Sequence, residues 1–146
     1  MHKRIFDFNK EILFGEFGAL ISAPIAAFIA SQFTKSASFI SAVAVLGSLA
    51  GASLFWIAMR AFDEKRRHEL SVNHLATDVG YFTPAAFLTT LLFYYPTLFF
   101  LSRHMINQDY RIVSSVMLSQ ILAFSMFLIV MNLYHHYLWK IAKIDF

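Results

Sequence analysis

Long apolar stretches separated by short polar segments form the main pattern of the chain. A helix that crosses a bilayer needs about 20 largely apolar residues, and four stretches reach that length, at 12–31, 39–59, 79–101 and 112–134. Lipid offers the backbone no hydrogen-bond partners, so an open chain satisfies its N–H and C=O groups there only as helix. The pattern predicts an all-α fold, an integral membrane four-helix bundle in which residues 1–146 form a single transmembrane domain.

Composition strengthens this membrane assignment. Hydrophobic residues make up 58% of the chain and charged residues 14%, whereas a soluble domain carries roughly 25% charged residues. Little sequence is left for an aqueous domain, so we expect a multi-pass protein of the cell (inner) membrane that is not an enzyme. The chain has no cysteine, which excludes thiol nucleophiles and cysteine-ligated metals. We expect no cofactor.

Basic residues predict the orientation of the spans, because Lys and Arg concentrate in cytoplasmic loops. Nine of the 12 lie before the first stretch, between the second and the third, or after the fourth: Lys3, Arg4, Lys10, Arg60, Lys65, Arg66, Arg67, Lys140 and Lys143. Both termini and the central loop are therefore predicted to be cytoplasmic. The same distribution accounts for the net charge of +3, and we expect no nucleic acid partner.

Small residues are frequent in the first two stretches. Gly47 and Gly51 form a GxxxG pair, a spacing that lets two helix backbones approach closely. The pair indicates a packed helix face. It is compatible with a contact inside the chain and with a homodimer through the Gly47/Gly51 face, and both alternatives stay open at this point.

The two predicted hairpins resemble each other. Glu16 precedes Gly18 by two residues, as Asp78 precedes Gly80, and both hairpins close with aromatic and basic residues after a small polar one. Because both would start and end on the cytoplasmic side, the repeat would be a parallel one, related by an axis along the membrane normal. Chance similarity is the alternative, since apolar sequence aligns easily.

Glu16 is the one acidic residue well inside a predicted span. A carboxylate in the membrane is costly and by default marks a functional site, where it would bind a cation, relay a proton or contact a substrate hydroxyl. The alternative is a structural polar contact, since Glu16 lies about one helical turn from the predicted cytoplasmic end and can reach the headgroups. Asp78 lies near a helix N-terminus, where the helix dipole favours an acid.

The segment 132–140 combines histidines, aromatic rings and a lysine. His135 and His136 point about 100° apart on a helix, so they cannot chelate one metal together, and we expect neither metal nor haem. Such aromatic and basic residues anchor helices at the membrane interface, yet Asn132, His136 and Trp139 share one helical face. We expect Asn132 to face another helix or a bound polar group, because an unpaired amide there is costly.

Basic side chains at the predicted cytoplasmic edge have two interpretations. They could hold the phosphate of a lipid or of a lipid-linked substrate, or they could serve only to determine topology. The residues in question are Arg60, Lys65, Arg66 and Lys140.

The end of the second hairpin resembles the GtrA-like family, small four-span membrane proteins with both termini inside and two similar hairpins. Hairpins of that family tend to close with asparagine, six residues, tryptophan, one residue and phenylalanine. Asn132, Trp139 and Ile141 have this spacing, with isoleucine in the last position.

Other parts of the chain match the family in fewer positions. Phe62 alone matches in the first hairpin, where Ser53 and Arg60 take the two earlier positions. Hairpin openings in the family resemble the residues Lys10, Gly15 and Gly18. The resemblance implies work on polyprenyl-phosphate-linked sugars, either moving them across the membrane or supporting their glycosyltransferase.

Three functions are consistent with these features. The leading hypothesis is a protein that binds and flips a polyprenyl-phosphate-linked sugar for cell-surface glycosylation, with a glycosyltransferase as partner. The cytoplasmic bases would attract the phosphate, Asn132, His136 and Trp139 would line the inner mouth, and Glu16 would contact the sugar or a coupling ion. The alternatives are an accessory or scaffold subunit of a larger membrane complex, and a small ion or metabolite carrier built around Glu16.

Overall fold

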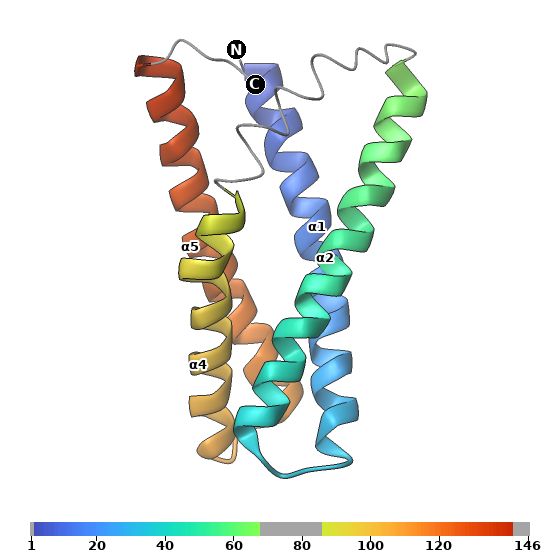
Figure 1. Cartoon of the computed structure of the whole chain (residues 1–146), viewed down its shortest axis with the longest axis vertical. Coiled ribbons are helices and arrows are strands. Elements are labelled where there is room, and N and C mark those ends of the chain that lie inside the picture. Colours follow the sequence, from blue (N-terminus) through green and yellow to red (C-terminus); the bar gives the residue numbers. More distant parts are fainter. Residues whose placement is uncertain (1, 68–85, 142–146) are drawn as a thin grey trace.

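The computed structural model describes residues 2–67 and 86–141, and every element in this part of the chain is helical (Figure 1). The predicted all-α fold is confirmed. The elements in chain order are α1 (His2–Ser31), α2 (Ala37–Arg67), the π-helix η1 (Thr90–Tyr94), α4 (Tyr95–Asn107) and α5 (Ile112–Ile141). A helical turn at 86–89 leads into η1.

Three of these helices are long and apolar enough to cross a membrane. Their apolar segments are Ile12–Ser31, Ala37–Met59 and Ile112–Tyr134, which match three of the four predicted spans closely. Of the fourth predicted span, residues 79–85 lie outside the described part, and the rest is helical from 86 to 107. By length and composition, the chain is therefore a membrane-embedded protein.

Two helical hairpins make up the bundle. Residues 32–36 join α1 to α2, and residues 108–111 join α4 to α5. In Figure 1, both turns lie at one end of the bundle. The first residues of α1 and the last residues of α2 and α5 lie at the other end. We call these the turn end and the terminal end. The two hairpins run in the same sense, as the expected parallel repeat requires, and the cytoplasmic location of the terminal end stays a prediction.

Glycine allows α1 and α2 to approach closely. A Cβ atom on Gly47 would lie 2.6 Å from the Cβ of Ala26, and one on Gly51 would overlap Ser22 and the backbone of Gly18. Ser22 Oγ also lies 2.7 Å from the carbonyl oxygen of Gly47 across the interface. The Gly47/Gly51 face is thus used inside the chain. The close approach of α1 fills the space beside Gly51, and the homodimer stays a prediction.

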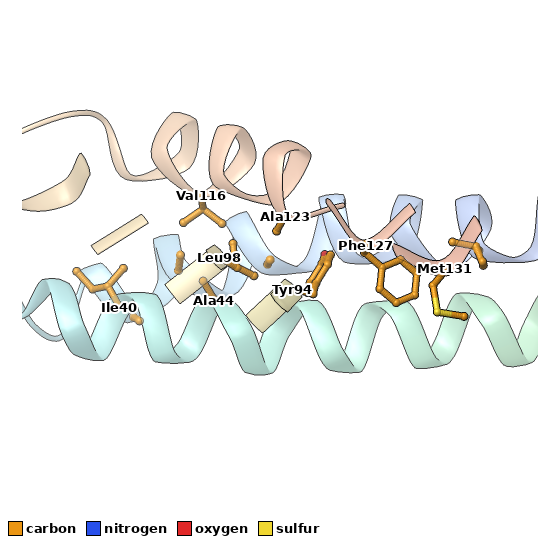
Figure 2. Packing of buried hydrophobic residues seen from close by; sticks show 12 residues of the cluster. Ile40, Ala44, Tyr94, Leu98, Val116, Ala123, Phe127 and Met131 are labelled. Carbon is orange, nitrogen blue, oxygen red and sulfur yellow. The ribbon is translucent and has the colours of Figure 1, made fainter. Parts of the chain in front are cut away.

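The interior has two apolar layers, separated by Tyr94 (Figure 2). Ile40, Leu98 and Val116 fill the layer toward the turn end, each at most 2% exposed. Phe127 and Met131 lie toward the terminal end. Large apolar side chains also cover the outside of the helices, where lipid tails solvate them as well as a protein interior would.

Candidate functional site

Glu16 points into the bundle. Its side chain is 7% exposed, and α1 begins at His2, so roughly 21 Å of helix precede it at 1.5 Å per residue. The carboxylate accepts a hydrogen bond from the Tyr94 hydroxyl, which lies 2.9 Å from Oε2 and 3.1 Å from Oε1. The contact that Glu16 makes is therefore with the interior of the bundle and not with the membrane headgroups.

Ser48 extends this contact to α2. Its Oγ lies 3.1 Å from the Tyr94 hydroxyl oxygen. Because the single hydroxyl proton of Tyr94 is directed at Glu16, Ser48 is the donor, and the three groups form a chain of hydrogen bonds from Ser48 through Tyr94 to Glu16. Ser48 is the middle residue of the apolar segment Ala37–Met59. The hydrogen bonds therefore lie deep inside the span.

A π-helix positions Tyr94. The Tyr95 N–H bonds to the carbonyl oxygen of Thr90, five residues earlier. The next residue, Pro96, has no N–H to give and its ring would crowd the carbonyl of Leu92, so a regular α-helical ladder cannot pass through this point. The result is a local π-helical turn, a feature that often occurs at functional sites.

The ring of Phe127 supports Tyr94 from the terminal end. The two ring centroids are 6.3 Å apart and the planes meet at 82°, an edge-to-face arrangement that aromatic pairs favour. Figure 2 shows Phe127 between Tyr94 and Met131. Packing against Phe127 fixes the ring of Tyr94 on this side, and hydrogen bonds fix its hydroxyl on the other.

Gln120 completes the site from α5. It is fully buried, and its amide lies beside the Glu16 carboxylate and the Tyr94 hydroxyl. Neither Nε2 nor Oε1 makes a hydrogen bond of good geometry with any described residue. A buried amide without well-formed hydrogen bonds is costly. We call Glu16, Ser48, Tyr94 and Gln120 the polar centre.

Among the residues that the sequence singled out, only Glu16 belongs to the polar centre. Asn132 is exposed, and its Nδ2 donates to the Leu128 carbonyl of its own helix at 2.8 Å. In the described part of the chain the Asn132 amide thus pairs within α5 and faces outward, and its contact with a bound polar group stays a prediction. His136 is exposed as well. Neither residue approaches Glu16.

The remaining predicted residues lie at helix ends or outside the described chain. Arg60, Lys65 and Arg66 lie on the last turns of α2, and Trp139 and Lys140 on those of α5. These two helix ends diverge at the terminal end of the bundle (Figure 1). The prediction for Asp78 falls outside the described residues.

Three residues of the polar centre were missed. Gln120 had a visible signal, since an amide within the apolar stretch 112–134 is unusual in lipid for the same reason as Glu16. Tyr94 lies two residues before Pro96 in the sequence YYP. The proline is the only local cue that the helix departs from regular α-helical geometry here. Ser48 has no distinguishing signal, because serine is common in packed membrane helices.

Metal binding receives no support from the described residues, which contain no group of three or more His, Asp or Glu side chains able to hold an ion. Comparison with protein-family models, with curated proteins and with solved structures finds no match to this chain. The GtrA-like resemblance therefore rests only on the residues quoted for it. The polar centre has to be interpreted from its own chemistry.

Proposed function

We propose that the chain is a small membrane transport protein, and that the transported species or its coupling ion binds at Glu16. The observation that carries the proposal is the polar centre itself. Four separate helical elements each contribute one polar group to a single point deep in the span, and one of these groups can carry a charge. This is the carrier alternative that the sequence left open.

The costs of the polar centre favour function over simple packing. Serine pairs and a glycine interface already join the helices, as the Ser22–Gly47 and Ser41–Ser102 contacts illustrate. A carboxylate adds a desolvation cost that hydrogen bonds inside membranes offset only in part, since such bonds contribute about 0.6 kcal/mol on average. The unpaired amide of Gln120 adds a further cost. If packing were the only role of these residues, serine and glycine contacts would join the helices at a lower free-energy cost.

Flux measurements test the proposal. Purified protein is reconstituted into liposomes, and proton, sodium and potassium fluxes are followed with ion-sensitive dyes under imposed gradients. We expect the wild type to conduct at least one of these ions and Glu16→Gln to lose the flux. The matched control is Ser125→Ala on α5, an exposed residue whose hydroxyl bonds only to its own helix. Equal flux in wild type and Glu16→Gln would contradict the proposal.

A second candidate is the movement of a polyprenyl-phosphate-linked sugar. The observation in its favour is the chemistry of the polar centre, because carboxylate, amide and hydroxyl groups are the partners that sugar hydroxyls require. Arg60, Lys65, Arg66 and Lys140 would attract the phosphate at the terminal end. Mass spectrometry of lipid extracted from the purified protein tests this candidate. A stoichiometric protein partner without such a lipid would favour the scaffold alternative instead.

A further inference from the structure

We propose that Glu16 and Gln120 form a proton-binding site that exchanges protons with the turn end of the bundle. The inference deepens the proposed function, since it names the ion that Glu16 binds. The proton site can be tested by itself, because proton binding can be measured without any flux. Only its biological role rests on the proposed transport function.

Gln120 can pair with both protonation states of Glu16. When the carboxyl is protonated, its O–H can donate to Oε1 of Gln120. When it is ionised, Nε2 of Gln120 can donate to the carboxylate after a rotation of the amide. A protonated carboxyl can pair with both ends of the amide at once, because its O–H donates to Oε1 while its C=O accepts from Nε2. The Gln120 amide lies beside the Glu16 carboxylate, and its polar atoms make no hydrogen bond of good geometry with a described residue, so it is suited to a proton on Glu16.

The described groups that face Glu16 from the neighbouring helices do not supply a positive charge. From η1 and α4 the titratable groups facing it are the phenols of Tyr94 and Tyr95. From α2 and α5 the facing groups are the neutral Ser48 and Gln120. An ionised carboxyl in this setting carries the full cost of an intramembrane charge. Binding a proton removes that charge without bringing any other ion into the bundle.

Buried serines lead from the polar centre toward the turn end. Ser102 of α4 donates to Ser41 of α2 at 2.9 Å, and Ser115 and Ser119 lie on α5 before Gln120. All four are fully buried. Ser115 and Ser119 donate to backbone carbonyls of α5, and the hydroxyl oxygens keep lone pairs that can accept a hydrogen bond from a water. These serines are interleaved with the apolar layer of Ile40, Leu98 and Val116. On the terminal side the polar centre is covered by Phe127 and Met131 (Figure 2).

Infrared spectroscopy tests the proton site directly. The carbonyl stretch of a protonated carboxyl is well separated from that of a carboxylate, so membranes holding the protein are titrated with buffer and the difference spectrum is recorded. We expect a protonated-carboxyl band that decreases as pH rises, that is absent in Glu16→Gln, and that shifts in frequency in Gln120→Leu. Added sodium chloride at constant pH should leave the band unchanged.

Two outcomes of that titration would overturn the proposal. A Glu16 band that does not respond to pH means that the group is sealed from protons. A band that disappears on addition of sodium at constant pH means that the site takes a metal cation. A titrating Glu16 in a protein without proton flux would leave the proton site standing and remove the transport function, so the two failures are distinguishable.

The direction of access is tested with silver ions, which react with thiols and do not cross lipid readily. Because the chain lacks cysteine, single variants Ser102→Cys and Met131→Cys report on the two sides of the polar centre. Lys35→Cys, in the exposed turn between α1 and α2, marks the side at which the turn end lies. We expect silver added on that side to block later maleimide labelling of Ser102→Cys and to spare Met131→Cys. Access to Ser102→Cys only from the opposite side, or from neither side, would refute the route.

Discussion

The Tyr94 hydroxyl lies 2.9 Å from one carboxylate oxygen of Glu16 and 3.1 Å from the other, although 78 residues separate the two in the chain. This contact joins the first hairpin to the second at the polar centre. Tyr94→Phe removes the hydroxyl and keeps the ring that packs on Phe127. Since hydrogen bonds in membranes contribute on the order of 1 kcal/mol, we expect a small loss of thermal stability.

The loss of transport in Tyr94→Phe should be much larger than the loss of stability, because Ser48 is then disconnected from Glu16. Circular dichroism melting in detergent and liposome flux measure the two effects. Tyr137→Phe is the control, since Tyr137 is 58% exposed and should tolerate the same change. Flux that falls only in proportion to the folded fraction would assign Tyr94 a purely structural role.

Gln120→Leu should make the protein more stable and less active. The leucine has a similar size and removes a buried amide whose two polar atoms make no hydrogen bond of good geometry with any described residue. Relief of that desolvation is worth about 1–3 kcal/mol, which denaturation in increasing detergent would detect. Gln32→Leu changes an exposed residue near the end of α1 and serves as the control. A destabilised Gln120→Leu protein would show that the amide has a structural partner.

Gly51→Ala should separate α1 from α2. The added methyl would overlap Ser22 and the backbone of Gly18, and the backbone cannot yield as a flexible side chain would. Overpacking of this kind costs about 1–3 kcal/mol. Gly15→Ala is a matched control on the same interface, because its methyl would lie 3.5 Å from the nearest atom, the Ala52 carbonyl oxygen. Equal melting temperatures for the two variants would contradict the packing described for α1 and α2.

Pro96→Ala should move Tyr94 without unfolding the helix. An alanine restores the missing N–H and permits a regular ladder in place of the π-helical turn at Thr90–Tyr94, so the residues of this turn would rotate about the helix axis. We expect unchanged or higher thermal stability with loss of flux. In the infrared titration, the Glu16 band should shift as in Tyr94→Phe. An unshifted band would mean that the π-helix does not depend on the proline.

Asn132→Ala separates the two candidate functions. The Asn132 amide bonds only to the Leu128 carbonyl of its own helix and is exposed, so its loss should change stability by less than about 0.5 kcal/mol. If the polar centre alone binds the transported species, flux is unaffected. If Asn132 lines the mouth for a lipid-linked sugar, the variant should lose the co-purifying lipid.

Sequence reasoning found three of the four predicted spans and singled out Glu16, because both depend on the cost of placing single residues in lipid. A run of apolar residues can be recognised in the sequence without knowing which helices pack beside it, and the same holds for a carboxylate within the run. The pairing of Glu16 with Tyr94 was not visible, since it depends on how each helix is rotated about its axis. The π-helical turn before Pro96 alters that rotation locally, and no periodic pattern records it.

Asn132 makes a local contact that its spacing did not suggest. Its spacing from His136 and Trp139 on one face suggested a shared site, on the assumption that an amide in an apolar helix needs a partner on another helix. The carbonyl four residues earlier supplied the partner instead. For Gly47 and Gly51, the sequence could indicate a close helix contact but not the contacting helix, which is α1 of the same chain.

The tight fit of α1 against α2 has a mechanical consequence. Glu16 and Ser48 are carried by one closely joined hairpin, whereas Tyr94 and Gln120 are carried by the other. The hydrogen bonds from Tyr94 to Glu16, from Ser48 to Tyr94 and from Ser102 to Ser41 all cross the seam between these two halves. A small sliding of one half past the other would break all three together and leave each hairpin whole, so the seam is where the proposed transport would require the bundle to open.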